Sequence, residues 1–141
     1  MLEIVKIIGG DTVITKAIQM TIFVRDRQKA KAFYTEKLGF TVRDEIEFSP
    51  GFHYLTVSPN KNNETVIELV QANTEEELKL IGKQAGEQIV IMFQSNDIEK
   101  DYLEMKGKGV VFHSAPQDVP GGKGVGFEDL YGNKYDLFQP Q

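Results

Sequence analysis

The sequence has 141 residues, of which 40% are apolar and 26% are charged, a balance typical of an ordinary globular protein rather than a disordered or membrane one. The net charge of −5, without a long basic run, argues against a nucleic-acid partner, and no stretch approaches the roughly 18 consecutive apolar residues that a membrane span requires. Cysteine is absent and the N-terminus lacks a secretory signal pattern, so we expect a cytoplasmic protein without disulfides whose partner is a small molecule or a second copy of the chain.

The first half of the chain has the pattern of a strand, a helix and three further strands. Residues 17–25 alternate along the chain, which predicts a half-buried strand. Asp26 then offers a side-chain oxygen as a helix N-cap, and Gly39 ends the apolar stripe that follows, because glycine readily takes the left-handed backbone found at helix ends. The three strands that complete this half are expected over residues 40–48, 52–58 and 64–70.

The second half repeats this order. It begins with a predicted strand over residues 88–94 and a helix capped by Asn96 or Asp97. Asp26 and Asp97 lie 71 residues apart, and the helix-ending Gly39 and Gly109 lie 70 residues apart, which indicates an internal repeat of about 70 residues. The strands that complete the second copy are expected near residues 110–114, 123–128 and 133–139.

These elements predict one α+β domain over residues 1–141. Module one covers about 17–70, module two covers about 88–139, and a polar connector over 71–87 lies between them, helical near 75–81. A helix after the first strand of each module covers one face of its sheet and leaves the other free to curve around a ligand in a cleft. The first dozen residues, with a turn at Gly9-Gly10-Asp11, are expected to add a strand or an arm.

Three segments resemble the vicinal-oxygen-chelate superfamily, which contains glyoxalase, bleomycin-resistance and extradiol-dioxygenase proteins. They are VRDRQKAKAFYTEKLGF (24–40), NDIEKDYLEMKGKGVVF (96–112) and FEDLYGNKYDL (127–137). The resemblance implies two tandem β-α-β-β-β modules with curved sheets around a cleft, and it implies a homodimer, since many members build or complete their pockets across a two-fold interface. Leu130 stands where the family's turn more often has proline.

The resemblance also implies four positions for a metal site. Members similar to glyoxalase I hold a divalent metal with one side chain from the first and last strand of each module, and the matching residues here are Gln19, Glu68, Val90 and Asp136. Valine replaces the usual histidine at the third position. Strand parity independently turns Gln19, Glu68 and Asp136 away from their apolar neighbours. Their oxygen atoms suit Mg²⁺ or Mn²⁺ better than Zn²⁺. Two alternatives stay open: one bound divalent metal ion (Mg, Mn, Ni or Zn), or no cofactor.

Other side chains are expected to contact a ligand. Phe23 shares the face of Gln19, and Tyr54 and Thr56 are predicted to line the same pocket. His113 is a candidate proton carrier or polar clamp, with a solvated strand end as the alternative. The glycine cluster GGKGVG (121–126) lacks the lysine–serine/threonine ending and the helix of a phosphate loop, and we expect a flexible hairpin loop at the pocket mouth.

Two functions follow for such a chain. The first is a small-molecule-binding protein that resembles bleomycin-resistance proteins, holding an apolar or cationic ligand in the cleft between modules, with Glu68 and Asp136 supplying negative charge and without the full metal site. The alternative is a metal-dependent lyase or isomerase resembling glyoxalase I, acting on a vicinal-oxygen substrate, with Glu68 or Asp136 as catalytic proton shuttle. Val90 favours the first. An extradiol dioxygenase needs two histidines and one carboxylate on iron, which these strands do not supply.

Overall fold

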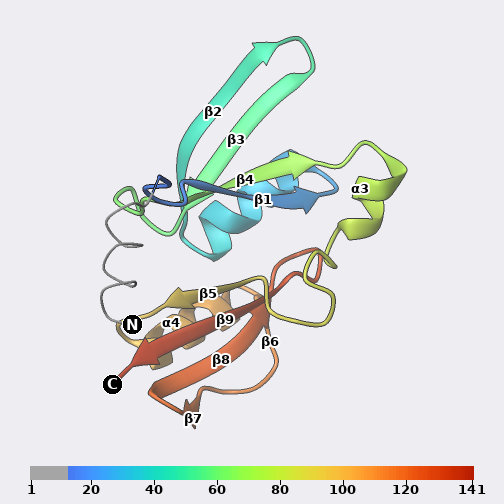
Figure 1. The fold of residues 1–141 in the computed structure, drawn as a ribbon. Coiled ribbons are helices and arrows are strands. Elements are labelled where there is room, and N and C mark those ends of the chain that lie inside the picture. The colour runs from blue at the N-terminus through green and yellow to red at the C-terminus, as the bar shows by residue number, and fades with distance from the viewer. Residues whose placement is uncertain (1–12) are drawn as a thin grey trace, which may run out of the picture.

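The computed structural model describes residues 13–141, whose strands form two separate sheets (Figure 1). The arm and turn expected in the first dozen residues lie outside this described part. The first sheet has the order β1-β4-β3-β2, formed by Gln19–Val24, Val66–Gln71, Phe52–Ser58 and Thr41–Ser49. The second has the order β5-β9-β8-β6, formed by Ile91–Gln94, Lys134–Pro140, Gly122–Glu128 and Val111–Phe112, with β7 (Gln117–Val119) paired to β8. The predicted α+β architecture with two curved sheets is confirmed.

The helix of the first module begins where its cap was predicted. Asp26 accepts a hydrogen bond from the backbone N–H of Lys29 at 3.0 Å, and helix α2 covers Arg27–Ala32. It continues as a π-helix, η1, over Phe33–Lys37. Gly39 then reverses the chain with φ +74°. The widened π turn was not predicted, because the apolar spacing of the sequence fits an ordinary helix as well.

The second module repeats this design. Helix α4 covers Ile98–Gly107, Asp97 caps it by accepting from the backbone N–H of Lys100 at 3.2 Å, and Gly109 follows with φ +94°. In the connector, a short helix α3 covers Glu75–Leu80. None of the described helices has the length and apolar character that crossing a membrane would require.

Both modules bury their apolar faces in one shared core. Ile22, Leu55 and Leu69 of the first sheet belong to the same buried cluster as Phe127, Tyr135 and Leu137 of the second. Aromatic rings join the halves: the ring centroids of Phe40 and Phe93 lie 5.3 Å apart, and those of Tyr34 and Tyr135 lie 6.5 Å apart. Because side chains alternate along a strand, the opposite face of each sheet points outward, away from this core.

A buried polar network also links the modules. Asp129 is buried and accepts hydrogen bonds from the hydroxyl of Tyr34 at 2.6 Å and from the backbone N–H groups of Tyr131 and Asn133, both at 2.9 Å. The hydroxyls of Tyr34 and Tyr135 lie 2.5 Å apart. Burial raises the pKa of both tyrosines, so they stay neutral donors, and these donors offset the desolvation of the carboxylate.

The prediction of a flexible loop over residues 121–126 is wrong. Gly121 lies in the turn with φ +87°, but Gly122 to Gly126 belong to β8. The physical reason is close packing of main chains: a Cβ at Gly122 would lie 2.0 Å from the carbonyl oxygen of Gln139 in β9. Gly122 therefore permits strand pairing rather than mobility. The short strand β7 was also missed by sequence reasoning.

Candidate functional site

The outward face of the first sheet joins three of the predicted site residues. The side-chain amide of Gln19 donates a hydrogen bond to Oε1 of Glu68 at 2.9 Å, and the hydroxyl of Tyr54 donates to Oε1 of Gln19. These residues come from β1, β4 and β3, which are neighbours in the sheet. The two predicted metal-ligand positions of module one are thus in direct contact, and Tyr54 lies beside them.

The surroundings of Glu68 favour either its neutral form or a cation beside its carboxylate. Partial burial raises the pKa of Glu68, although the charge of Arg27 and the hydrogen bond from Gln19 oppose that rise. The pKa of Tyr54 is also raised, first by burial and then by the negative charges of Glu68 and Asp44. A bound cation or hydrogen-bond donor would relieve the desolvation of Glu68.

Thr56 and Phe23 occupy different surroundings on this face. Thr56 pairs with Glu68 in register but is fully buried, and its hydroxyl accepts from the backbone N–H of Asp44 at 3.1 Å beside an irregularity in the β2–β3 register. Phe23 is half-buried. Its backbone N–H donates to the side-chain oxygen of Gln84 at 2.7 Å, and the Gln84 amide donates to the carbonyl of Thr21 at 2.9 Å. Thr56 and Gln84 therefore influence the site through hydrogen bonds to the backbone of neighbouring residues.

Sequence reasoning missed an aromatic cluster near the tip of the β2–β3 hairpin, which projects beyond the rest of its sheet (Figure 1). Phe48 and Phe52 are 62% and 61% exposed, and their ring centroids lie 5.9 Å apart. The ring of Phe48 also lies 5.8 Å from that of Tyr54. The alternation of Ile46 and Phe48 with glutamates carried the signal that this strand has an apolar face.

The outward face of the second sheet carries Asp136 and His113. Asp136 is paired with Met92 of β5 and with Gly126 of β8. His113 packs over Gly126, and its Nε2 lies 2.7 Å from Oε2 of Glu128. A hollow of about 390 Å³ opens on this face, lined by Met92, Ser114, Gln117, Val119, Pro120, Gly124, Val125, Gly126, Asp136, Leu137 and Phe138.

Within one chain the two faces do not meet. The shared core lies behind each of them, so Glu68 and Asp136 point outward from different sheets. Val90, at the third metal position, lies just before β5; its backbone N–H donates to the carbonyl of Lys134 at 2.7 Å, and its side chain packs against the core. Among residues 13–141, no three His, Asp or Glu side chains come together in a group suited to a metal ion.

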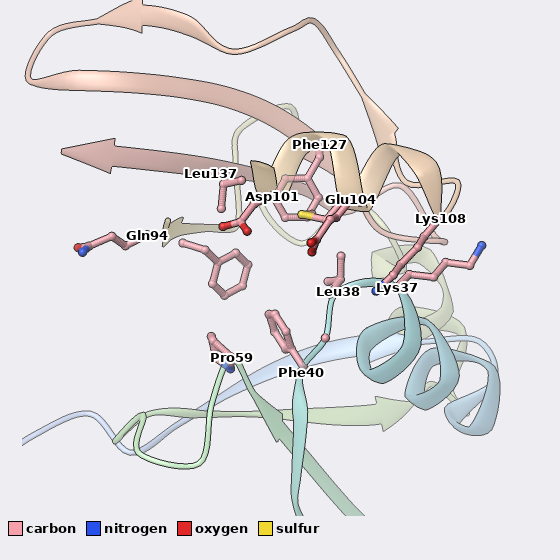
Figure 2. A pocket seen from close by; sticks show the side chains of 13 residues that line it. Lys37, Leu38, Phe40, Pro59, Gln94, Asp101, Glu104, Lys108, Phe127 and Leu137 are labelled. Carbon is pink, nitrogen blue, oxygen red and sulfur yellow. The ribbon is translucent and has the colours of Figure 1, made fainter. Parts of the chain in front are cut away.

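A cavity of about 210 Å³ lies between the end of η1 and helix α4 (Figure 2). Its walls are mixed: Leu38 and Phe40 from module one face Phe127 from module two, while Asp101 and Glu104 of α4 point into it. It is smaller than the roughly 300–1,000 Å³ usual for ligand pockets. Another hollow of about 540 Å³ near β5 has no charged side chain among the residues of 13–141 that line it. Of these three hollows, the one of about 390 Å³ on the outward face of the second sheet combines a volume in that range with a charged side chain, Asp136.

Comparisons with known proteins agree with this geometry. The model of a family described as the Glyoxalase/Bleomycin resistance protein/Dioxygenase superfamily matches residues 16–137. An uncharacterized protein of Shewanella frigidimarina is 32% identical over 123 residues, which cover 86% of this chain and 91% of that protein. Among solved structures, UcmS2 superposes with a TM-score of 0.78 at 30% identity, covering 89% of this chain and 98% of UcmS2. TnmS3, described as an antibiotic binding protein from Streptomyces sp. CB03234, superposes with a TM-score of 0.75 at 25% identity, covering 92% and 99%.

Proposed function

The chain belongs to the Glyoxalase/Bleomycin resistance protein/Dioxygenase superfamily, and from this premise we propose that it is a binding protein for a small apolar or cationic molecule. The observation that carries the proposal is the placement of one acid on each outward face, Glu68 beside Tyr54 and Asp136 above the hollow of the second sheet. Carboxylates among aromatic side chains attract organic cations and hydrogen-bond donors. The description of TnmS3 as an antibiotic binding protein supports the same class of function.

The ligand pocket forms in a homodimer. Because the two outward faces of one chain point away from a common core, a closed pocket needs a second copy, with the Glu68 face of one subunit set against the Asp136 face of its partner. Exposed apolar side chains on both faces support this arrangement: Phe48 and Phe52 on the hairpin, and Met92 at 54% exposure on β5. Exposed apolar clusters of this kind mark interaction surfaces in folded proteins.

The residues do not fit the metal site of a glyoxalase I-like lyase. Such a site would draw on Gln19, Glu68 and Asp136 and would need an imidazole where this chain has Val90. Gln19 and Glu68 already satisfy each other through a hydrogen bond. Two carboxylates and an amide alone form a weak set for the later transition metals. The lyase alternative therefore has less support than ligand binding.

Calorimetric titration with three apolar cations tests the proposal: aminoacridine, adamantylamine and tetraphenylphosphonium. We expect at least one to bind, and Glu68→Gln to weaken its affinity at least about tenfold, because the variant removes the charge but keeps a polar side chain of the same shape. Glu64→Gln is the matched control, since Glu64 is exposed and its ion pair within the described residues is a long one of 4.0 Å with Lys16. Turnover of a hemithioacetal at ordinary enzyme rates, or no binding of any probe at millimolar concentration, would refute the proposal.

A further inference from the structure

The outward face of β8 lacks side chains at alternate positions. Gly124 and Gly126 lie in the middle of this strand, on the face that Asp136 shares, and both line the hollow of about 390 Å³. That volume falls in the range of roughly 300–1,000 Å³ typical of ligand pockets. Neither glycine has the positive φ that would explain its presence by backbone conformation. The bare backbone of Gly124 therefore forms the floor of a trough, and the ring of His113 covers Gly126 at one end.

Side chains line both edges of this trough. On the β9 side, Asp136 pairs with Gly126 and Phe138 pairs with Gly124. On the other side, a Cβ added at Gly124 would lie 3.4 Å from Val119 of β7, and His113 stands over Gly126. The floor is thus flat and flanked by an aromatic ring and an aliphatic side chain, with polar groups at one end.

The polar end offers two hydrogen-bond acceptors to a ligand. The carboxylate of Glu128 carries no proton, so Nε2 of His113 must be the donor in their hydrogen bond. In the neutral imidazole, Nδ1 then carries the lone pair. The position of a Cβ at Gly126 lies 2.8 Å from Nδ1 of His113 and 3.6 Å from Oδ1 of Asp136. Both acceptors therefore lie at this end of the trough, and a ligand group that contacts them has to be a donor.

We propose that this trough receives the flat face of an aromatic ring whose edge donates hydrogen bonds to Asp136 and His113. The ligand class is a planar aromatic amine. Glycine lets the ring approach the backbone of β8, where any Cβ would hold it away. The inference rests on the proposed function, since the partner's outward face of the first sheet would form the roof, and it narrows the ligand from apolar cations in general to planar donors.

Matched probes separate shape from hydrogen bonding. Aminoacridine is planar and donates, N-methylacridinium is planar and cationic without a donor, and adamantylamine donates from a globular body. By calorimetry with the intact protein we expect aminoacridine to bind at least about tenfold more tightly than either of the others. Equal affinity for N-methylacridinium would overturn the role of the two acceptors.

The matched variants are Gly124→Ala and Gly107→Ala. A Cβ at Gly124 meets only ordinary contacts from 3.4 Å outward, so the variant can fold, which circular dichroism would verify, yet its methyl group rises from the floor. We expect it to weaken aminoacridine binding at least about tenfold. Gly107 lies in α4 with nothing within 4 Å of its added Cβ, and Gly107→Ala should bind like the parent protein.

The outcomes distinguish this inference from the proposed function. If adamantylamine or tetraphenylphosphonium binds in a manner that depends on Glu68, while Gly124→Ala leaves aminoacridine binding unchanged, the trough is refuted and the binding function stands. If aminoacridine does not bind but another cation does, the planar ligand class is refuted. If no probe binds the parent protein, both fall together.

Discussion

The hydroxyl of Tyr34 donates a 2.6 Å hydrogen bond to Asp129, a residue 95 positions further along the chain. The contact joins the helical segment of module one to the turn before β9 in module two. Both residues are buried, so neither can exchange its partner for water. The two modules are therefore held together by a polar bond as well as by apolar packing, and its removal is measurable.

Tyr34→Phe should destabilise the protein by about 1.5–3 kcal/mol, because it removes a buried hydrogen bond to a charged group while keeping the ring. Urea denaturation at fixed protein concentration measures this. Tyr102→Phe is the control, since the Tyr102 hydroxyl makes only a 3.2 Å contact with Lys106 one helical turn away. Equal midpoints for the two variants would contradict a special role for the Tyr34–Asp129 bond.

Stability should respond to pH through Glu68. Its folded-state pKa is raised, so between the ordinary value of 4.5 and the raised value the folded state binds more protons than the unfolded state. Stability therefore falls as pH rises through that window, and the ionised carboxylate destabilises the fold above it. At about pH 7, Glu68→Gln should therefore be more stable than the parent protein. The gain should be less than about 1 kcal/mol because the group is partly solvated, and it should disappear at about pH 4.

Glu45 provides the opposite sign, and thermal unfolding of the Glu68→Gln and Glu45→Gln variants across this pH range measures both effects. Its hydrogen bond with Lys31, 2.7 Å long, lowers the pKa of Glu45. The ion pair stabilises the fold above the unfolded-state pKa and is lost as pH falls through the folded value. Glu45→Gln should thus be less stable than the parent at neutral pH. A shift of the same sign in Glu45→Gln and Glu68→Gln would contradict these assignments.

The aromatic tip of the β2–β3 hairpin should control assembly. We expect the parent protein to sediment as a dimer and Phe48→Ser combined with Phe52→Ser to sediment as a monomer. Burying a phenylalanine contributes about 1.5–3 kcal/mol, so losing two should raise the dissociation constant at least about a hundredfold. Leu103→Ser is the control, since Leu103 is 65% exposed on α4, away from either outward sheet face. A parent protein that sediments as a monomer would refute the proposed pocket.

A histidine at position 90 should create a metal site if the four family positions converge across the dimer. Val90→His should raise the affinity for Ni²⁺, Co²⁺ or Zn²⁺ at least about tenfold over the parent protein, because imidazole suits these ions. Calorimetry and the metal content of purified protein measure this. Ile89→His is the neighbouring control. No change in Val90→His would mean that position 90 does not face Glu68 and Asp136 in the dimer.

Local signals in the sequence were sufficient for the helix ends and for the faces of the strands. Asp26 and Asp97 cap helices and Gly39 and Gly109 end them, because capping depends on one side chain and its nearest backbone groups. Strand parity likewise placed Gln19 and Glu68 on one face, and the structure joins them by a hydrogen bond. Their roles in binding stay predictions.

Relationships between distant segments could not be predicted in the same way. Strand parity identifies a face but does not say which faces of two modules pack together, so the outward separation of Glu68 from Asp136 emerged only from the shared core. The glycine cluster suggested a loop because the reason for Gly122, the nearby main chain of Gln139, lies in another strand. The cavity between η1 and α4 likewise depends on residues from both halves.

Gln84 has a consequence for how the protein avoids aggregation. β1 lies at the edge of its sheet, where unpaired backbone groups can recruit a strand from another molecule and start an open-ended stack. The side-chain amide of Gln84 accepts from the backbone N–H of Phe23 and donates to the carbonyl of Thr21. It thus occupies two backbone groups that an added strand would pair with. Gln84 thereby blocks edge-to-edge growth at β1, which would have no natural end, and it leaves the sheet faces as the surfaces for the proposed two-subunit assembly.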